Sequence, residues 1–199
     1  MRAFWKRRPP AERPVVPATT EDEVREHAEA AVYAGFLDLA DAVEQVTEYF
    51  DEEAPPTARI EQIVRAAWAA RAVAVGAGSG IDDHARLASA FAALADDGIV
   101  GRMDFTCCQT CGHAEIDDER GPAREERGYT FFHQQDTERI ADGQLYLAYG
   151  AFGPEVAEEA IAGAVVERLR AEGLAVTWNG ETTSRIEVAI GDWRKPLPA

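Results

Sequence analysis

Three cysteines and one histidine lie within seven residues of one another, in the stretch that reads Phe105-Thr-Cys-Cys-Gln-Thr-Cys-Gly-His-Ala-Glu115. No other cysteine occurs among the 199 residues. Cysteine thiolates bind metal ions, exchange disulfides and act as nucleophiles, and imidazole is a common metal ligand. This stretch, called the cysteine segment below (residues 105–115), is therefore the first candidate for chemistry.

A second polar stretch follows an aromatic strand pattern further along the chain. It reads His133-Gln-Gln-Asp-Thr-Glu138 and is called the histidine segment (residues 133–138). His133, Gln135 and Asp136 could line a polar pocket. In a purely structural interpretation, Asp136 caps a short helix and His133 is a hydrogen-bonded residue at the end of a strand.

One local conformation open to the cysteine segment is the start of a helix. Thr106 is then the N-cap and Gln109 completes a capping box. At about 100° per residue the three cysteines share one face, Glu115 joins them, and His113 points elsewhere. A C-x-x-C pair at the start of a helix also has a lowered thiol pKa, which favours redox or nucleophilic chemistry.

A second conformation is a tight turn over Cys108–Gly112 that resembles one knuckle of a zinc ribbon. One knuckle supplies two ligands, so a four-coordinate site needs two more, and the candidates are Cys107, His113 and His133. In a third interpretation the cysteines are inert and packed in the core, since free cysteine often serves as a small hydrophobic residue.

Capping signals and helical periodicity predict four helices before residue 98. Thr20-Glu-Asp-Glu23 is a capping box, Pro55-Pro56 ends the second helix, and Thr57 caps the third. The stretch Gly76–Gly80 lacks the glycine spacing of a dinucleotide-binding loop and is predicted to be a linker. The predicted helices cover residues 20–35, 37–53, 57–75 and 82–97.

After residue 98 the pattern changes to strands and one long helix, at residues 153–172. The last two strands are joined by a turn containing Asn179-Gly180, and alternation predicts one buried face for Val176, Trp178, Ile186 and Val188. The predicted strands cover residues 99–105, 129–133, 145–149, 174–178 and 185–190.

These elements predict an α+β fold, with helices packed on one face of a mixed, largely antiparallel sheet of about five strands and with an N-terminal helical segment. The predicted organisation is a disordered, basic, proline-rich tail (residues 1–19), a helical segment (20–75) and an α+β domain (82–199) that carries the cysteine segment.

Charge is distributed unevenly along the chain. The net charge is −16, but the first 20 residues hold five of the 20 basic side chains and only one of the 36 acidic ones. The acidic remainder repels phosphate backbones, so we expect no nucleic-acid partner for it. No apolar run is long enough to cross a membrane. An odd number of closely spaced cysteines makes a poor disulfide framework, which predicts a reducing, cytoplasmic setting.

Four stretches, FTCCQTCGHAEI, GYTFFHQQDTE, LYLAYGA and GLAVTWNG, together resemble a bacterial family described only as a domain of unknown function. The resemblance covers residues 85–195 and excludes the N-terminal helices. It implies no activity. The signature positions that it implies are Cys107, Cys108, Cys111, His133, Gln135 and Asp136.

The sequence therefore predicts a cytoplasmic binding or regulatory domain whose Cys/His cluster holds a metal, zinc, in a closed structural site. One alternative is a thiol-dependent oxidoreductase or other thiol enzyme, with Cys107 or Cys108 as the reactive thiolate. Another is a metal-free protein-interaction domain with buried cysteines. The partner is a protein or small molecule that the sequence does not identify. The candidate metal ligands are Cys107, Cys108, Cys111, His133 and His113, and the other polar candidates are Gln135, Asp136 and Glu115.

Overall fold

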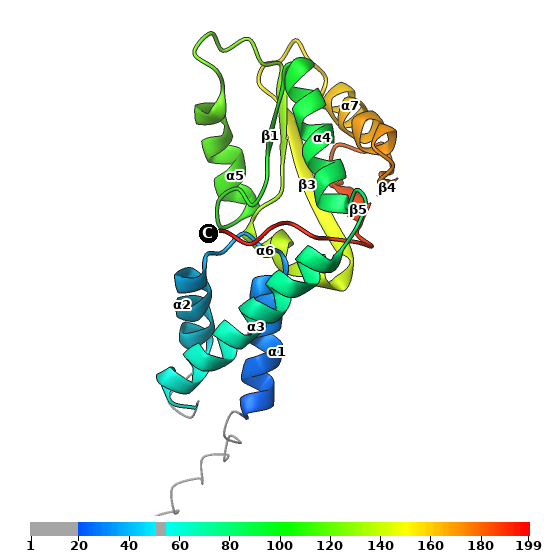
Figure 1. Cartoon of the computed structure of the whole chain (residues 1–199). Helices are drawn as coiled ribbons and strands as arrows, with labels where there is room; N and C mark the ends of the chain where they lie inside the picture. Colours follow the sequence, from blue (N-terminus) through cyan, green and yellow to red (C-terminus); the bar gives the residue numbers. More distant parts are fainter. Residues whose placement is uncertain (1–19, 51–54) are drawn as a thin grey trace, which may run out of the picture.

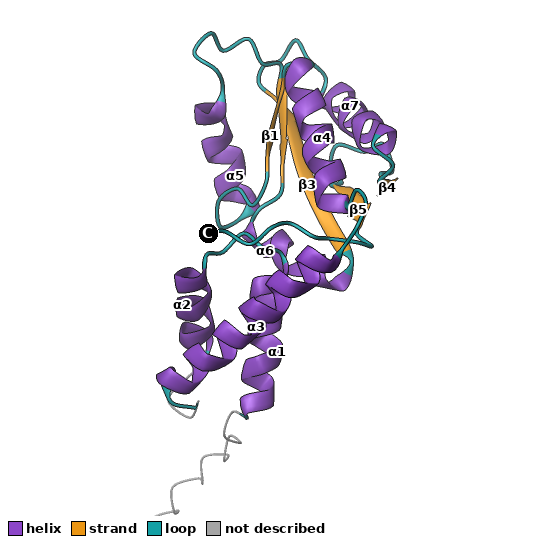
Figure 2. Ribbon diagram, in the orientation of Figure 1, coloured by secondary structure: helices purple, strands orange, loops and turns teal. Residues whose placement is uncertain are grey.

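The computed structural model describes residues 20–50 and 55–199 (Figure 1). The predicted N-terminal tail and the predicted end of the second helix lie outside these residues. Helices make up the N-terminal part of the described chain, and a sheet with helices on both sides makes up the rest (Figure 2). None of the helices within the described residues is long and apolar enough to cross a bilayer.

Three helices form the N-terminal segment: α1 (Glu21–Tyr33), α2 (Leu39–Tyr49) and α3 (Thr57–Ala77). The predicted capping box at the start of α1 is present. The predicted cap of α3 is wrong. Thr57 is already helical, because the carbonyl of Pro56 accepts the first hydrogen bonds of the helix. The three helices share a core of their own, made of Val24, Ala28, Val32, Ala42, Val46, Ile60, Ile63, Val64 and Ala67.

The rest of the chain forms a five-stranded sheet in the order β1-β2-β3-β5-β4. Only β1 and β2 pair in parallel, and the other three pairs are antiparallel. The predicted α+β class and the mixed, largely antiparallel sheet are confirmed. The elements in chain order are α4 (Asp83–Asp96), β1 (Ile99–Arg102), α5 (Gln109–Glu115), η1 (Ile116–Glu119), β2 (Gly128–Phe131), α6 (Gln134–Thr137), η2 (Glu138–Asp142), β3 (Gln144–Ala151), α7 (Glu158–Ala171), β4 (Ala175–Thr177) and β5 (Ile186–Ala189).

The two long helices α4 and α7 cover one face of the sheet, as predicted, and the short helix α5 lies on the opposite face (Figures 1 and 2). Alternation along β2 separates the two sides. Phe131 packs with Val100, Ile116 and Ala148 on the α5 side, whereas Phe132 belongs to the larger core on the other side.

The predicted C-terminal strand pair is confirmed, with Val176 opposite Val188. Ile186 and Val188 are fully buried, whereas Val176 and Trp178 are only partly buried because β4 is the edge strand.

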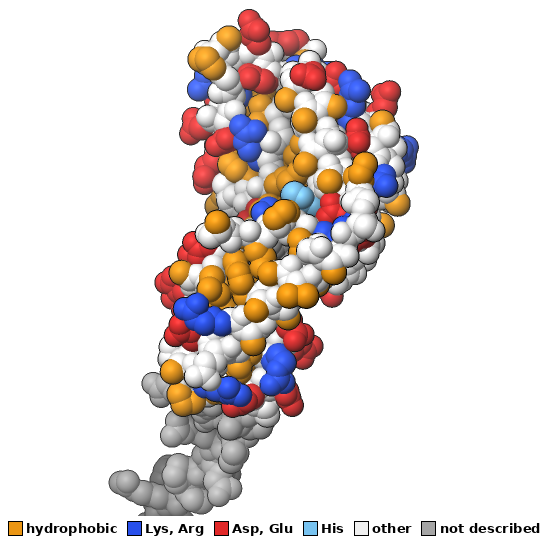
Figure 3. All heavy atoms as spheres, viewed as in Figure 1, with side chains coloured by type: hydrophobic (Ala, Val, Ile, Leu, Met, Phe, Trp, Pro, Cys, Tyr) orange, Lys and Arg blue, Asp and Glu red, His pale blue; other side chains and the backbone are white. Residues whose placement is uncertain are grey.

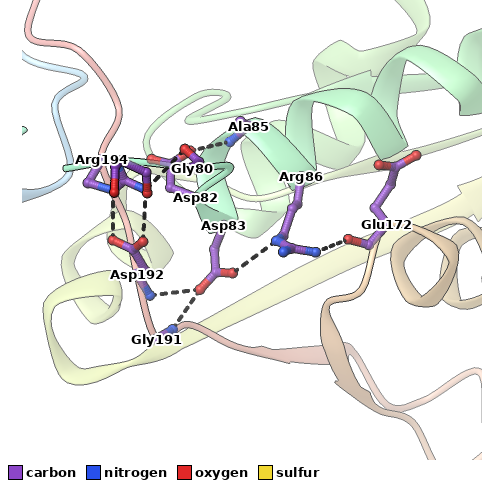
Figure 4. A network of polar contacts seen from close by, with 10 residues as sticks. Gly80, Asp82, Asp83, Ala85, Arg86, Glu172, Gly191, Asp192 and Arg194 are labelled. Carbon is purple, nitrogen blue, oxygen red and sulfur yellow. Dashed lines mark hydrogen bonds and ion pairs between the residues drawn. The ribbon is translucent and has the colours of Figure 1, made fainter.

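The predicted linker around Gly80 is held in place by the C-terminal residues (Figure 4). Arg194 Nη2 donates to the carbonyls of Ser79 and Gly80, and its guanidinium pairs with Asp192. Asp83 at the start of α4 accepts the backbone N–H groups of residues 191 and 192 at 2.7 and 2.8 Å. The end of the chain is thereby fixed across the start of α4.

Trp193 joins the N-terminal helices to the sheet. Its side chain is only 1 % exposed, and its indole N–H donates to the carbonyl of Ala34 at 3.0 Å. Arg71 of α3 donates to the carbonyl of Trp193 at 2.6 Å, and Lys195 donates to the carbonyl of Gly35 at the same distance. The C-terminal segment therefore fastens α1 and α3 to the larger core.

We predict that Trp193→Ala lowers the free energy of unfolding by about 3–5 kcal/mol, because it empties a large buried site and leaves the Ala34 carbonyl without its donor. Urea denaturation measures the change. Val73→Ala is the matched control, since Val73 is 73 % exposed and its truncation should be nearly neutral. If Trp193→Ala lowered the free energy of unfolding by less than about 1 kcal/mol, the contact between the N-terminal helices and the sheet would contribute little to stability.

A second prediction concerns His27 and His84, which are partly buried against aromatic rings. Burial lowers the pKa of both imidazoles below the ordinary value of 6.5. As the pH falls, the unfolded chain therefore binds protons before the folded one does, and stability decreases from about pH 7 to about pH 5. In the double variant His27→Gln, His84→Gln this decrease should be smaller. Unchanged pH dependence in denaturant titrations would contradict the prediction.

Candidate functional site

The cysteine and histidine segments lie side by side because they follow the two parallel strands. The carboxyl ends of parallel strands meet at the same edge of a sheet. Two backbone hydrogen bonds then continue the pairing past the strand ends. Phe105 N–H donates to the carbonyl of Phe132 at 2.8 Å, and Gln134 N–H donates to the carbonyl of Thr106 at 3.2 Å. The approach of the two segments, predicted from the sequence, is present in the fold.

The backbone that enters the cysteine segment is strained. Asp104 and Thr106 adopt φ values of 51° and 58°, in the left-handed region that a β-branched residue such as threonine rarely enters. The side chain of Thr137 donates to the Asp104 carboxylate at 2.6 Å and ties this turn to the histidine segment. Strain of this kind persists only where surrounding structure imposes it, and it is common at functional sites.

The three sulfur atoms converge at the start of α5. Sγ of Cys111 lies 3.2 Å from Sγ of Cys108 and 3.4 Å from Sγ of Cys107. All three residues are free thiols. Among the described residues this is the only group of three potential ligands whose atoms all lie within 4.8 Å of one another. Thiolates bound to one tetrahedral zinc at about 2.3 Å lie about 3.8 Å apart, so small shifts would admit the ion.

Two expectations for this segment are wrong. The N-cap of α5 is Cys108, whose sulfur accepts the N–H of Cys111, and not Thr106. The left-handed backbone at Thr106 turns the chain before the helix can begin, which leaves Cys107 outside it. The thiols are also not buried, because Cys107 is exposed and the other two are partly exposed. That exposure argues against inert cysteines in the core.

Contacts within the cluster divide the protons unequally between the thiols. The backbone N–H of Cys111 stabilises the thiolate of Cys108 and lowers the pKa of Cys108. Hydrogen bonds with the sulfurs of Cys108 and Cys107 raise the pKa of Cys111 to about 12. In the metal-free protein Cys108 therefore loses its proton more readily than Cys111 does.

His133 lies in the histidine segment beside a buried carboxylate. Its Nε2 is 2.9 Å from Asp136, which is only 1 % exposed. Burial lowers the pKa of His133. Because a carboxylate oxygen lies beside Nε2, the neutral ring donates from that nitrogen to Asp136. Nη1 of Arg185 also donates to both Asp136 oxygens, at 2.9 and 2.7 Å. No imidazole belongs to the sulfur group within the described residues.

The other predicted residues occupy the borders of the site. His113 packs its ring on Phe131 and Tyr129, and its Nδ1 lies 2.9 Å from the Tyr129 hydroxyl, which places it toward the sheet. Glu115 is exposed at the end of α5, and Gln135 is exposed in α6. The structure thus brings the three cysteines together and places His133 and Asp136 near them.

Two hollows flank the cysteine cluster. The first, called the polar hollow, has a volume of about 310 Å³. The second, called the helical hollow, has a volume of about 610 Å³, is bordered by Cys107, and lies between α1, α2 and the histidine segment. Gln135 borders both. The polar hollow is lined by Cys108, Gln109, Thr110, His133, Gln135, Asp136, Arg139 and Arg185.

Arg139 and Arg185 line the site but are not singled out by any pattern in the sequence. Arg185 is 49 residues from Asp136 in the chain, and only the folding of β5 beside β3 brings the two together. One signal was available, since a buried aspartate requires a cationic or hydrogen-bonding partner. That requirement predicts a partner without saying which arginine supplies it.

Comparison with known proteins identifies a family but no characterised relative. Residues 17–197 match a family model described as a domain of unknown function (DUF6891). No curated protein and no solved structure matches the chain. The family match is longer than the resemblance noted in the sequence, since it takes in the N-terminal helices.

The packing of α5 on the sheet generates a third prediction. A Cβ added at Gly112 would lie 2.3 Å from the ring of Phe131, which is fully buried. We expect Gly112→Ala to displace α5 and lower the free energy of unfolding by about 1–3 kcal/mol. Gly163→Ala is the matched control, because Gly163 in α7 has open space around it and should gain about 0.5–1 kcal/mol. Equal effects in urea denaturation would contradict this packing.

Proposed function

The chain belongs to the DUF6891 family, a domain of unknown function, and we propose that it is a metal-binding domain whose three cysteines hold a zinc ion. The observation that carries the proposal is the convergence of the three sulfurs. Those of Cys108 and Cys107 lie 3.2 and 3.4 Å from that of Cys111. Soft thiolate ligands favour zinc among the abundant divalent ions. The thiols require a reducing compartment, for which the cytoplasm is the proposed location.

The proposed site has three protein ligands and an open fourth position. No imidazole lies in the sulfur group within the described part of the chain, so the closed Cys₃His site expected from the sequence is not the arrangement that we propose. Cys108 borders the polar hollow, and an exogenous ligand could reach the ion from there. Zinc with three protein ligands keeps its fourth position for water or another exchangeable ligand, an arrangement more typical of catalytic than of structural zinc.

Metal analysis tests this proposal. Protein purified under reducing conditions should contain about one zinc ion per chain, and chelation should lower the melting temperature because the ion binds only the folded state. Co²⁺ substitution should give the charge-transfer absorption of thiolate ligands. Cys107→Ser, Cys108→Ser and Cys111→Ser should each weaken binding.

Thr110→Ser is the matched control for these variants, since it changes a neighbouring side chain of the same segment without removing a sulfur. It should keep the full metal content. A content below about a tenth of an equivalent, with no rise in melting temperature when zinc is added, would refute the proposal.

A second candidate function is thiol–disulfide exchange. The observation that favours it is the 3.2 Å separation of the Cys108 and Cys111 sulfurs in a C-x-x-C spacing. Two thiols would become one disulfide, and a partner disulfide would accept the two electrons and two protons and become two thiols. A metal-free protein that forms this bond reversibly with glutathione would support the second function over the first.

A further inference from the structure

We propose that the polar hollow binds a small oxyanion, a carboxylate or a phosphate, through the guanidinium groups of Arg139 and Arg185. The inference does not depend on the metal proposal, because neither arginine belongs to the sulfur cluster. It assigns a ligand class to the hollow beside Cys108.

The charges that line the polar hollow are two guanidinium groups and one carboxylate, Asp136. That carboxylate is already satisfied, since it accepts from Arg185 Nη1 and from His133 Nε2 inside the protein. The pair of Asp136 and Arg185 cancels in charge, so the hollow keeps the positive charge of Arg139. Cys108 at its border adds a negative charge only when its thiol ionises. A cationic hollow is unusual in a chain with a net charge of −16, whose acidic side chains are spread over the face in Figure 3.

Both arginines have donors left for a ligand. Arg185 uses only Nη1, and its Nε and Nη2 make no hydrogen bond to any described residue. Arg139 makes neither an ion pair nor a side-chain hydrogen bond within residues 20–50 and 55–199. Guanidinium groups bind carboxylate and phosphate oxygens in pairs, which few other side chains do.

Both arginines that border the polar hollow also contact the ring of Tyr146. The guanidinium carbons of Arg185 and Arg139 lie 5.0 and 5.9 Å from the centroid of its ring. Each contact is a favourable cation–π interaction that helps to hold its guanidinium group beside the hollow.

The remaining lining residues suit the same ligand. Gln109, Thr110 and Gln135 offer neutral amide and hydroxyl donors. A volume of about 310 Å³ fits a small molecule, and the acidic surface outside repels large polyanions such as nucleic acids. The ligand that fits is therefore a free small anion, held next to the thiol of Cys108.

Calorimetric titration of the full chain with inorganic phosphate and with acetate, at constant ionic strength set by chloride, tests the proposal. We expect saturable binding of at least one probe, and the stronger probe distinguishes a phosphate ligand from a carboxylate ligand. Arg139→Gln should weaken that binding at least tenfold. Arg65→Gln should not change it, because Arg65 pairs with Glu61 on the exposed side of α3, away from the hollow.

A second measurement places the bound anion. Occupancy of the hollow should slow alkylation of Cys108 by iodoacetamide relative to Cys107, as read by mass spectrometry of peptides. If Arg139→Gln fails to fold by circular dichroism, Arg139→Ala and Arg185→Lys replace it, and at least one must weaken binding.

No saturable binding of either probe, or equal binding by the Arg139 and Arg65 variants, would overturn the proposal. Both titrations are repeated on chelator-treated protein. Anion binding without zinc would leave this inference standing if the metal proposal failed, and zinc binding without anion binding would leave only the metal proposal.

Discussion

The parallel pairing of β1 with β2 is the constraint on which the rest of the site depends. Parallel neighbours require a crossover connection, and here residues 103–127 supply it. The crossover contains α5, so the cysteines lie around the start of this helix, beside the end of β2. The hydrogen bonds of Phe105 with Phe132 and of Gln134 with Thr106 extend the pairing. An antiparallel pair would have sent the two polar segments to opposite edges of the sheet.

The buried carboxylate of Asp136 adds a second constraint. An ionised carboxylate that is 1 % exposed costs several kcal/mol of desolvation unless it is paired and hydrogen-bonded. Arg185 from the start of β5 and His133 from the end of β2 satisfy it together. The same ion pair therefore connects the strand β5 to the histidine segment and fixes one guanidinium group that lines the polar hollow. The ion pair that satisfies the buried carboxylate thus also positions a charged group of the site.

The sequence predicts what depends on neighbouring residues and misses what depends on distant ones. The capping box at Thr20 and the strand pair at Val176 and Val188 follow from local pattern, and both are present. The T-x-x-Q pattern at Thr106 is equally local, yet Thr106 does not cap the helix. It adopts a left-handed backbone, and its carbonyl accepts the Gln134 N–H from the histidine segment. The cysteine cluster could be predicted because its members are adjacent, whereas Arg185 could not.

The positions of the three sulfurs follow from the turn at Thr106 and assign each thiol a different environment. Cys107, outside the helix, borders the helical hollow, and Cys108, as the N-cap, borders the polar hollow. The sulfur of Cys111, in the first turn of α5, contacts both of the other sulfurs. The cluster thus lies between the helical hollow and the polar hollow. If the cluster holds an ion as proposed, these two hollows are the spaces that border its ligands, Cys107 on one side and Cys108 on the other.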